Sequence, residues 1–303
     1  MSEGEPRVLV STEWLAERLD DPTVAVVDMR WREDGSAAAR YEAAHVPGAV
    51  RLDWSSDIVE PSERAAFMLA RPARFAEAME ARGIGDDTLV VAYADRHGSG
   101  PFRLWWAFRM YGHDTARILD GGLEAWLAEG RPVEPGPPPQ PALEKAGWTP
   151  GPPLDPAERA TAEDVLAARD RTGIAVIDAR LPDQFRGEVV WFETGSIAAG
   201  DDGVARTPRG DIRAGRVPWA VNVPWASLYR DDGRLKSPSD LRAVLDAAGV
   251  PRDVPRAITY CGVGISASAL LFALHQAGVP SVSLYDASWD EWGRLPGAPV
   301  ARG

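Results

Sequence analysis

The chain has 303 residues, 45% hydrophobic and 26% charged, which is ordinary for a globular protein and long enough for two domains. Its 45 acidic and 33 basic residues give a net charge of −12, which argues against nucleic acid or an anionic membrane as a partner. No apolar run approaches the roughly 20 residues that span a bilayer, and residues 1–7 are too polar for a signal peptide. A single cysteine excludes an internal disulfide, so we expect a cytoplasmic protein.

The first half predicts strands that alternate with helices. A helical stretch that Ser11 can cap precedes residues 24–30, an apolar run that ends in Asp-x-Arg. Such a run is typical of a buried parallel strand that leads into a loop. Residues 89–93 predict a second strand of this kind, and residues 102–111 predict an apolar helix after it.

The segment 131–156 is dense in proline and glycine, including Gly136-Pro137-Pro138-Pro139. Such a stretch fits neither a helix nor a central strand. We therefore predict an N-terminal domain over 1–135, a linker over 136–157 and a C-terminal domain over 158–303. The cysteine described below makes the first of these domains non-catalytic and the second catalytic in this prediction.

The second half repeats the first. Residues 174–180, 216–220, 256–260 and 284–288 correspond in turn to 24–30, 45–49, 89–93 and 118–122. A repeat this long indicates domain duplication rather than a solenoid. We predict an α/β fold of two tandem domains, each a parallel sheet with helices on both faces.

Two differences separate the halves. Asp95 lies 25 residues before Asp120 and Cys261 lies 25 before Asp286, which places Asp95 opposite the cysteine. The offset between the halves grows from 150 residues at Asp28 and Asp178 to 171 at His45 and Arg216. The second half therefore carries about 20 extra residues within 188–215, a length that suits a functional loop.

The cysteine opens the sequence Cys261-Gly262-Val263-Gly264-Ile265-Ser266, between a predicted strand and a predicted helix. Ligands bind at this end of the strands in open α/β sheets. The two glycines allow a tight loop whose N–H groups can point at the sulfur, and the helix dipole adds to their effect. Both stabilise a thiolate nucleophile. The alternative is a small core cysteine, but the strand, glycine loop and helix in sequence favour catalysis.

Two segments resemble the signatures of the rhodanese family. Residues 41–52, which include His45-Val46-Pro47-Gly48, resemble its N-terminal signature, and residues 282–292 resemble its C-terminal one, with Ala287 where the family usually has glycine. The resemblance extends over nearly the whole chain. It implies tandem rhodanese domains, the second active, in which Cys261 takes a sulfane sulfur as a persulfide and passes it to a thiol or cyanide.

The resemblance leaves the donor open. Thiosulfate-type enzymes place cationic residues directly after the cysteine, where this chain has Gly262 and Val263. Mercaptopyruvate-type enzymes read Cys-Gly-Ser-Gly-Val-Thr, and here Val263 replaces the serine hydroxyl. We expect a small anionic donor, a thiol acceptor such as thioredoxin or a small thiol, and no cofactor.

The resemblance also suggests residues outside the loop. Phe185-Arg186-Gly187 resembles the substrate-arginine motif, and a guanidinium fork suits a carboxylate or thiosulfonate. We expect Arg186 to point toward the Cys261 sulfur; otherwise Arg206, Arg209 or Arg213 of the inserted segment takes that role.

His45 corresponds to a histidine proposed for proton transfer, with Asp34 as its acidic partner, although it could equally brace its turn. Arg180 is expected to be structural, and Asp120, Asp286, Trp289 and Trp292 are assigned to turns and core. Four scattered histidines and one cysteine predict no metal site.

Two other functions compete with sulfur transfer. A cysteine phosphatase needs an arginine to close a loop one residue longer, and Ser266, Ala267 and Ser268 offer none. A non-enzymatic sulfur carrier or regulatory module is the second alternative. Such modules typically lose the cysteine, so the intact loop favours an enzyme.

Overall fold

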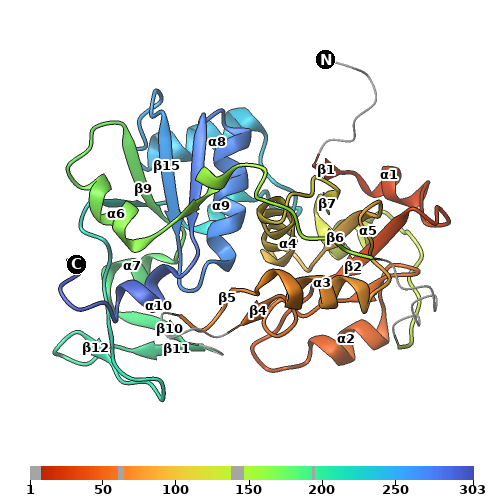
Figure 1. Cartoon of the computed structure of the whole chain (residues 1–303), viewed down its shortest axis with the longest axis horizontal. Coiled ribbons are helices and arrows are strands. Elements are labelled where there is room, and N and C mark those ends of the chain that lie inside the picture. The colour runs from red at the N-terminus through yellow and green to blue at the C-terminus, as the bar shows by residue number, and fades with distance from the viewer. Residues whose placement is uncertain (1–7, 61–64, 138–146, 193–194) are drawn as a thin grey trace. The chain divides into compact units, whose positions relative to one another are not determined.

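The computed structural model describes residues 8–60, 65–137, 147–192 and 195–303 (Figure 1). The polar N-terminus and part of the predicted linker lie outside these ranges. The chain forms two compact units. The first comprises Met1–Val59, Leu69–Asp155 and Tyr229–Leu235; the second comprises Glu60–Met68, Pro156–Leu228 and Lys236–Gly303.

The first unit is built on a five-stranded parallel sheet of order β1-β7-β6-β2-β3. Its core gathers apolar side chains of strands and helices, among them Val91, Tyr93 and Trp126. The strands are β1 (Leu9–Val10), β2 (Val24–Asp28), β3 (Val50–Arg51), β6 (Leu89–Tyr93) and β7 (Ala116–Leu119). The helices are α1 (Thr12–Ala16), α2 (Ala37–Ala43), α3 (Pro72–Glu80), α4 (Gly100–Met110) and α5 (Gly122–Ala128).

The second unit repeats this plan with a parallel sheet of order β14-β9-β15-β16-β8. Its core includes Val176, Ile258 and Trp292. The strands are β8 (Arg159–Ala160), β9 (Ile174–Asp178), β14 (Ala220–Asn222), β15 (Arg256–Tyr260) and β16 (Ser281–Tyr285). The helices are α6 (Ala162–Ala168), α7 (Pro182–Arg186), α8 (Pro238–Ala247), α9 (Ile265–Gln276) and α10 (Ser288–Trp292), with short turns η1 (Pro156–Glu158) and η2 (Trp225–Leu228).

The inserted segment of the second half forms two antiparallel hairpins. The first joins β10 (Val189–Phe192) to β11 (Gly195–Ala198), and the second joins β12 (Val204–Ala205) to β13 (Ile212–Arg213). Two further short strands, β4 (Val59–Glu60) and β5 (Met68–Leu69), pair with each other. The extra residues are thus folded structure rather than a plain connection.

The predicted α/β class and the duplication are confirmed, and the cap at Ser11 forms as expected. The Ser11 side chain accepts the Trp14 N–H, and Thr161 and Asp164 make a reciprocal capping box. The predicted domain limits at 135 and 158 stay a prediction. They assign Glu60–Met68 to the first domain and Tyr229–Leu235 to the second, whereas in the structure each of these short segments belongs to the other unit.

The strand register corrects one sequence alignment. Asp28 pairs with Tyr93 across β2 and β6, and Asp178 pairs with Tyr260 across β9 and β15. The residues after these tyrosines, Ala94 and Cys261, are therefore equivalent. The alignment of Asp95 with Cys261 is wrong by one residue, because it counted back from the later aspartate and the first unit has one residue more in that stretch.

Candidate active site

Cys261 lies between the end of β15 and the start of α9. It is a free thiol with only 2% of its surface exposed. The N–H of Gly264 donates to Sγ at 3.1 Å. Gly264 has φ +80°, a left-handed conformation that favours glycine, and this turn aims its N–H back at the sulfur. One N–H of the loop therefore points at the sulfur, where the sequence predicts several.

The other predicted loop residues differ in access. Val263, Gly264 and Ile265 are buried, whereas Gly262 and Ser266 are partly exposed. Ser266 lies in the first turn of α9. A reactant that reaches the loop from outside meets Gly262 and Ser266 first.

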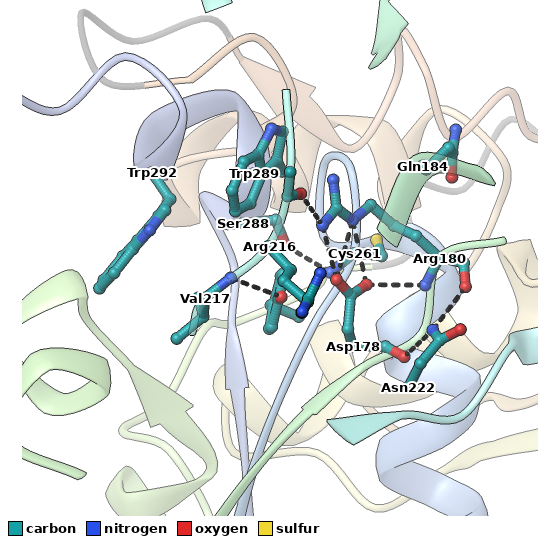
Figure 2. A network of polar contacts seen from close by, with 12 residues as sticks. Asp178, Arg180, Gln184, Arg216, Val217, Asn222, Cys261, Ser288, Trp289 and Trp292 are labelled. Atoms are coloured by element: carbon teal, nitrogen blue, oxygen red, sulfur yellow. Dashed lines mark hydrogen bonds and ion pairs between the residues drawn. The ribbon is translucent and has the colours of Figure 1, made fainter. Parts of the chain in front are cut away.

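The backbone of the loop is held by the turn that begins α10. Ser288 Oγ accepts the Cys261 N–H at 3.1 Å (Figure 2). It also donates to the Tyr285 carbonyl at 2.8 Å. Trp289 N–H donates to the Cys261 carbonyl at 3.0 Å, and Asp290 N–H donates to the Gly262 carbonyl at 2.9 Å. The Cys261 peptide is thus fixed on both sides, which sets the direction of its side chain.

Ser288 is buried and has φ +54°, uncommon for a residue with a Cβ. Its counterpart in the first unit is Gly122, with φ +58°. A Cβ at Gly122 would lie 2.2 Å from the Ala94 carbonyl, which no packing tolerates. The serine hydroxyl therefore occurs only in the unit that carries the cysteine. Sequence reasoning missed Ser288, although it lies inside the C-terminal signature.

Asp178, which ends β9, and Arg180 form a buried ion pair, the platform, and β9 pairs with the strand β15 that leads to Cys261 (Figure 2). Arg180 Nε and Nη2 donate to the Asp178 carboxylate, and the guanidinium lies 4.3 Å from the ring centre of Trp289. Burial has the largest single effect and lowers the pKa of Arg180, but the Asp178 charge and the contacts with Asp178 and Tyr260 together outweigh it, so that pKa is raised. Burial, followed by the Asp178 charge, raises the pKa of Tyr260 well above its usual value. Arg180 is structural, as expected.

The first unit contains the same platform without the thiol. Asp28 pairs with Arg30, and Tyr93 donates to the Asp28 carboxylate at 2.5 Å. The platform therefore belongs to the shared fold, and the chemistry depends on the residue directly after the tyrosine. Of the four residues assigned to turns and core, Asp286, Trp289 and Trp292 are buried, and Asp120 accepts the Leu235 N–H.

Arg186 ends α7 with a side chain that is 48% exposed, and its Nε pairs with Glu188 at 2.6 Å. This hydrogen bond raises the pKa of Arg186 and lowers that of Glu188. In this arrangement its partner is Glu188, not the Cys261 sulfur toward which it was expected to point. Its substrate role stays a prediction.

The three arginines of the inserted segment have different partners. Arg213 donates to the carbonyls of Trp292, Gly293, Leu295 and Ala298, so it is structural. Arg206 is exposed and pairs with Asp202 and Asp211. Arg209 pairs with Asp290 at 3.1 Å, and the Asp290 N–H donates to the Gly262 carbonyl. Arg209 is thus connected to Gly262 of the catalytic loop through a single intervening residue, Asp290.

His45 belongs to the first unit and is buried. Its Nδ1 lies 2.8 Å from the Tyr41 carbonyl, and its Nε2 lies 3.5 Å from Glu134 Oε1. The acidic neighbour of His45 is therefore Glu134 rather than Asp34. Asp34 is exposed and accepts the Ser36 N–H at 2.9 Å, because the turn before α2 directs it there. These contacts suit a bracing histidine, and the catalytic roles of His45 and Asp34 stay predictions.

Within the described ranges, no group of three or more histidine, cysteine, aspartate or glutamate side chains could hold a metal ion. A search of the same residues for a helix long and apolar enough to cross a membrane also finds none.

Known proteins resemble this chain in fold and in sequence. The rhodanese-like domain family matches residues 11–129 and 161–295. The chain is 35% identical to the sulfur carrier protein TtuD of Thermus thermophilus, over 100% of this chain and 99% of that one. It is 35% identical to the 3-mercaptopyruvate sulfurtransferase of Escherichia coli, over 96% of each. The crystal structure of SseA from Escherichia coli, a 3-mercaptopyruvate sulfotransferase, matches with a TM-score of 0.75 and 32% identity over 94% of this chain and 99% of that one.

Two parallel-sheet units, one with a cysteine loop at its strand ends, define a tandem rhodanese fold. The matches cover nearly the whole chain, so the chain belongs to the rhodanese family. It is an enzyme of that family, a sulfurtransferase.

Proposed function

We propose that Cys261 carries the transferred sulfur as a persulfide. Its thiolate attacks the outer sulfur of thiosulfate, the S–S bond of the donor breaks, and sulfite leaves with the bonding electron pair. With 3-mercaptopyruvate the C–S bond breaks instead, and the thiol proton moves to the carbon of the leaving enolate to give pyruvate. A thiol or cyanide acceptor then attacks the outer sulfur of the persulfide and restores the thiolate.

The observation that carries this proposal is the contact between Gly264 N–H and Cys261 Sγ at 3.1 Å. A backbone donor at the start of α9 stabilises negative charge on sulfur in both the thiolate and the persulfide. Cys261 is also the only thiol in the chain. No other side chain can form a persulfide.

Arginines outside the loop would hold the donor. Gly262 and Val263 carry no charge, yet thiosulfate and 3-mercaptopyruvate are anions. Arg209 is joined to the loop through Asp290, and Arg186 would exchange Glu188 for the donor. We propose both as donor contacts, each with a fork that can pair with two oxygens.

The roles of His45 and Asp34 in proton transfer, a thioredoxin or small thiol as acceptor, and the cytoplasm as compartment are further parts of the proposal. The acidic surface fits small molecules or proteins rather than nucleic acid as partners. A lone reduced cysteine is typical of a reducing compartment.

The test compares thiosulfate and 3-mercaptopyruvate as donors in parallel, by kcat/KM with cyanide and with dithiothreitol as acceptors. Intact-mass spectrometry of protein treated with donor alone should show the addition of one sulfur atom, which cyanide removes. The Cys261→Ser variant should show neither turnover nor adduct. Turnover by that variant would refute the persulfide mechanism.

A sulfur carrier is the second candidate, since a full-length relative is named as one. A carrier would form the same adduct on Cys261 but release it slowly to small acceptors. Fast turnover with cyanide or dithiothreitol would favour the enzyme. A stable adduct with negligible turnover would favour the carrier.

A further inference from the structure

The first hairpin of the inserted segment brings an indole against the catalytic loop. Trp191 lies in β10, opposite Ser196 of β11. A Cβ built on Gly262 would lie 3.5 Å from Cε3 of the Trp191 ring and 3.9 Å from its Cβ. The indole thus lies beside the residue that directly follows the nucleophile, and a side chain at that position would touch it.

A second aromatic ring, that of Phe67, lies next to the Trp191 indole. Phe67 lies with its ring centre 6.1 Å from that of Trp191 and tilted by 50°. Its neighbour Ala66 donates its N–H to Asp290 Oδ2 at 2.8 Å, and the Asp290 N–H donates to the Gly262 carbonyl. The segment that carries Phe67 is therefore tied to the same residue that fixes Gly262.

The exposure of the loop residues determines how the Trp191 and Phe67 rings can affect a reactant. Cys261 and Val263 are buried, whereas Gly262 and Ser266 are partly exposed, so Gly262 is one of the two positions at which a reactant from outside first meets the loop. The outer sulfur of a persulfide lies about 2 Å beyond Sγ and must be reached in line with the S–S bond. An indole beside Gly262 limits the width of the group attached to the attacking atom.

We propose that Trp191 is a specificity-determining residue, which admits compact sulfur acceptors to the Cys261 persulfide and disfavours bulky ones. The inference rests on the persulfide mechanism proposed above. The indole lies beside Gly262 and takes no part in bond making. Its effect should therefore appear in the ratio between acceptors rather than in the transfer step itself.

The experiment measures kcat/KM for cyanide and for reduced glutathione at a fixed, saturating donor concentration. For Trp191→Ala, we expect the ratio of glutathione to cyanide to rise about tenfold, since steric pockets discriminate by about 10–200-fold per group. Trp191→Phe, which keeps a flat ring, should change the ratio by less than Trp191→Ala. The matched control is Trp14→Ala, which removes a first-unit indole that packs under Arg18.

Each outcome supports or overturns the role of Trp191. Equal losses for both acceptors, or a ratio that stays at the wild-type value, would overturn the proposal and make Trp191 a structural residue. If Trp191→Ala does not fold, the Trp191→Phe and Trp191→Leu ratios decide in the same way. The mass of the donor-treated wild type separates the two levels: without a sulfur adduct the persulfide mechanism itself fails, whereas an adduct with an unchanged ratio refutes Trp191 alone.

Discussion

Cys261 and Ala94 occupy the same position in the two units. Each comes directly after the last residue of a central strand, and each carbonyl accepts an N–H at 3.0 Å, from Trp289 in one case and Leu123 in the other. The backbone that presents a nucleophile is therefore present twice, and only one copy has a thiol.

A thiol placed in the first unit should stay inactive. The Ala94→Cys change in a Cys261→Ser background puts sulfur in the equivalent position, but Gly122 supplies no hydroxyl to the cysteine N–H. Asp95, the next residue, adds a carboxylate that is paired with Arg32. We expect no transfer from thiosulfate or 3-mercaptopyruvate and no sulfur adduct by intact mass. An adduct on the introduced thiol would show that the backbone alone suffices.

Ser288→Gly should separate stability from activity. Glycine relieves the backbone strain at φ +54° but removes the acceptor of the Cys261 N–H. We expect a change in unfolding free energy within about 1 kcal/mol, because the two effects oppose each other. Sulfur transfer should fall several-fold in kcat. Urea unfolding and steady-state kinetics measure the two quantities, and an unchanged kcat would contradict the positioning role.

The matched tyrosines should behave alike in stability and differently in transfer. Tyr260→Phe and Tyr93→Phe each leave a buried polar partner unsatisfied, since Val217 N–H and Val46 N–H donate to the two hydroxyls. We expect each variant to lose about 1–3 kcal/mol of unfolding free energy. Only Tyr260→Phe should also change kcat, because Tyr260 directly precedes the nucleophile. Equal effects on kcat would contradict this.

Donor binding should depend on arginines outside the loop. Arg209→Ala and Arg186→Ala should each lower kcat/KM for anionic donors by about tenfold or more, mainly through KM. Arg186→Lys should recover only part, because a point charge does not reproduce a fork. Arg206→Ala, an exposed arginine of the same segment, is the control. An arginine whose alanine variant keeps the wild-type kcat/KM for both donors does not bind them.

Asp120 should make the first unit less stable as pH rises. Burial raises the pKa of its carboxyl in the folded protein, despite the Leu235 N–H that it accepts. Between the ordinary aspartate pKa and this raised value, the folded state binds more protons than the unfolded one, so stability falls with rising pH. Asp120→Asn keeps an oxygen acceptor and removes this titration. The difference in unfolding free energy between variant and wild type should shift in favour of the variant from pH 4 to pH 7. A constant difference would contradict the assignment.

The fold was accessible from the sequence because buried parallel strands have a strong local pattern. The apolar runs that end in Asp-x-Arg are β2 and β9, and the glycine loop after β15 identified Cys261. The match of residues 89–93 with 256–260 places Ala94 opposite Cys261, as the strand register does. Counting back from Asp120 and Asp286 placed Asp95 there instead, because the loop lengths between strand and aspartate differ by one residue and local patterns do not show this.

The contacts that hold the candidate site residues could not be predicted from local sequence patterns either. The hydroxyl of Ser288 acts on a residue 27 positions earlier, and Asp290 gathers contacts from Ala66 and Arg209. The partner of His45 is Glu134, far along the chain, whereas Asp34 was chosen for its nearness in sequence. The contact of Arg186 with Glu188, two residues on, overrides its expected direction.

Each unit contains a short segment from the other half of the chain, so a cut in the linker would separate residues of one unit from each other. A chain cut in the linker would leave the N-terminal fragment without Tyr229–Leu235, whose last N–H satisfies Asp120. The C-terminal fragment would lose Glu60–Met68 and, with Ala66, one partner of Asp290. Neither fragment would contain all the residues of its own unit, so neither repeat is a contiguous stretch of the chain.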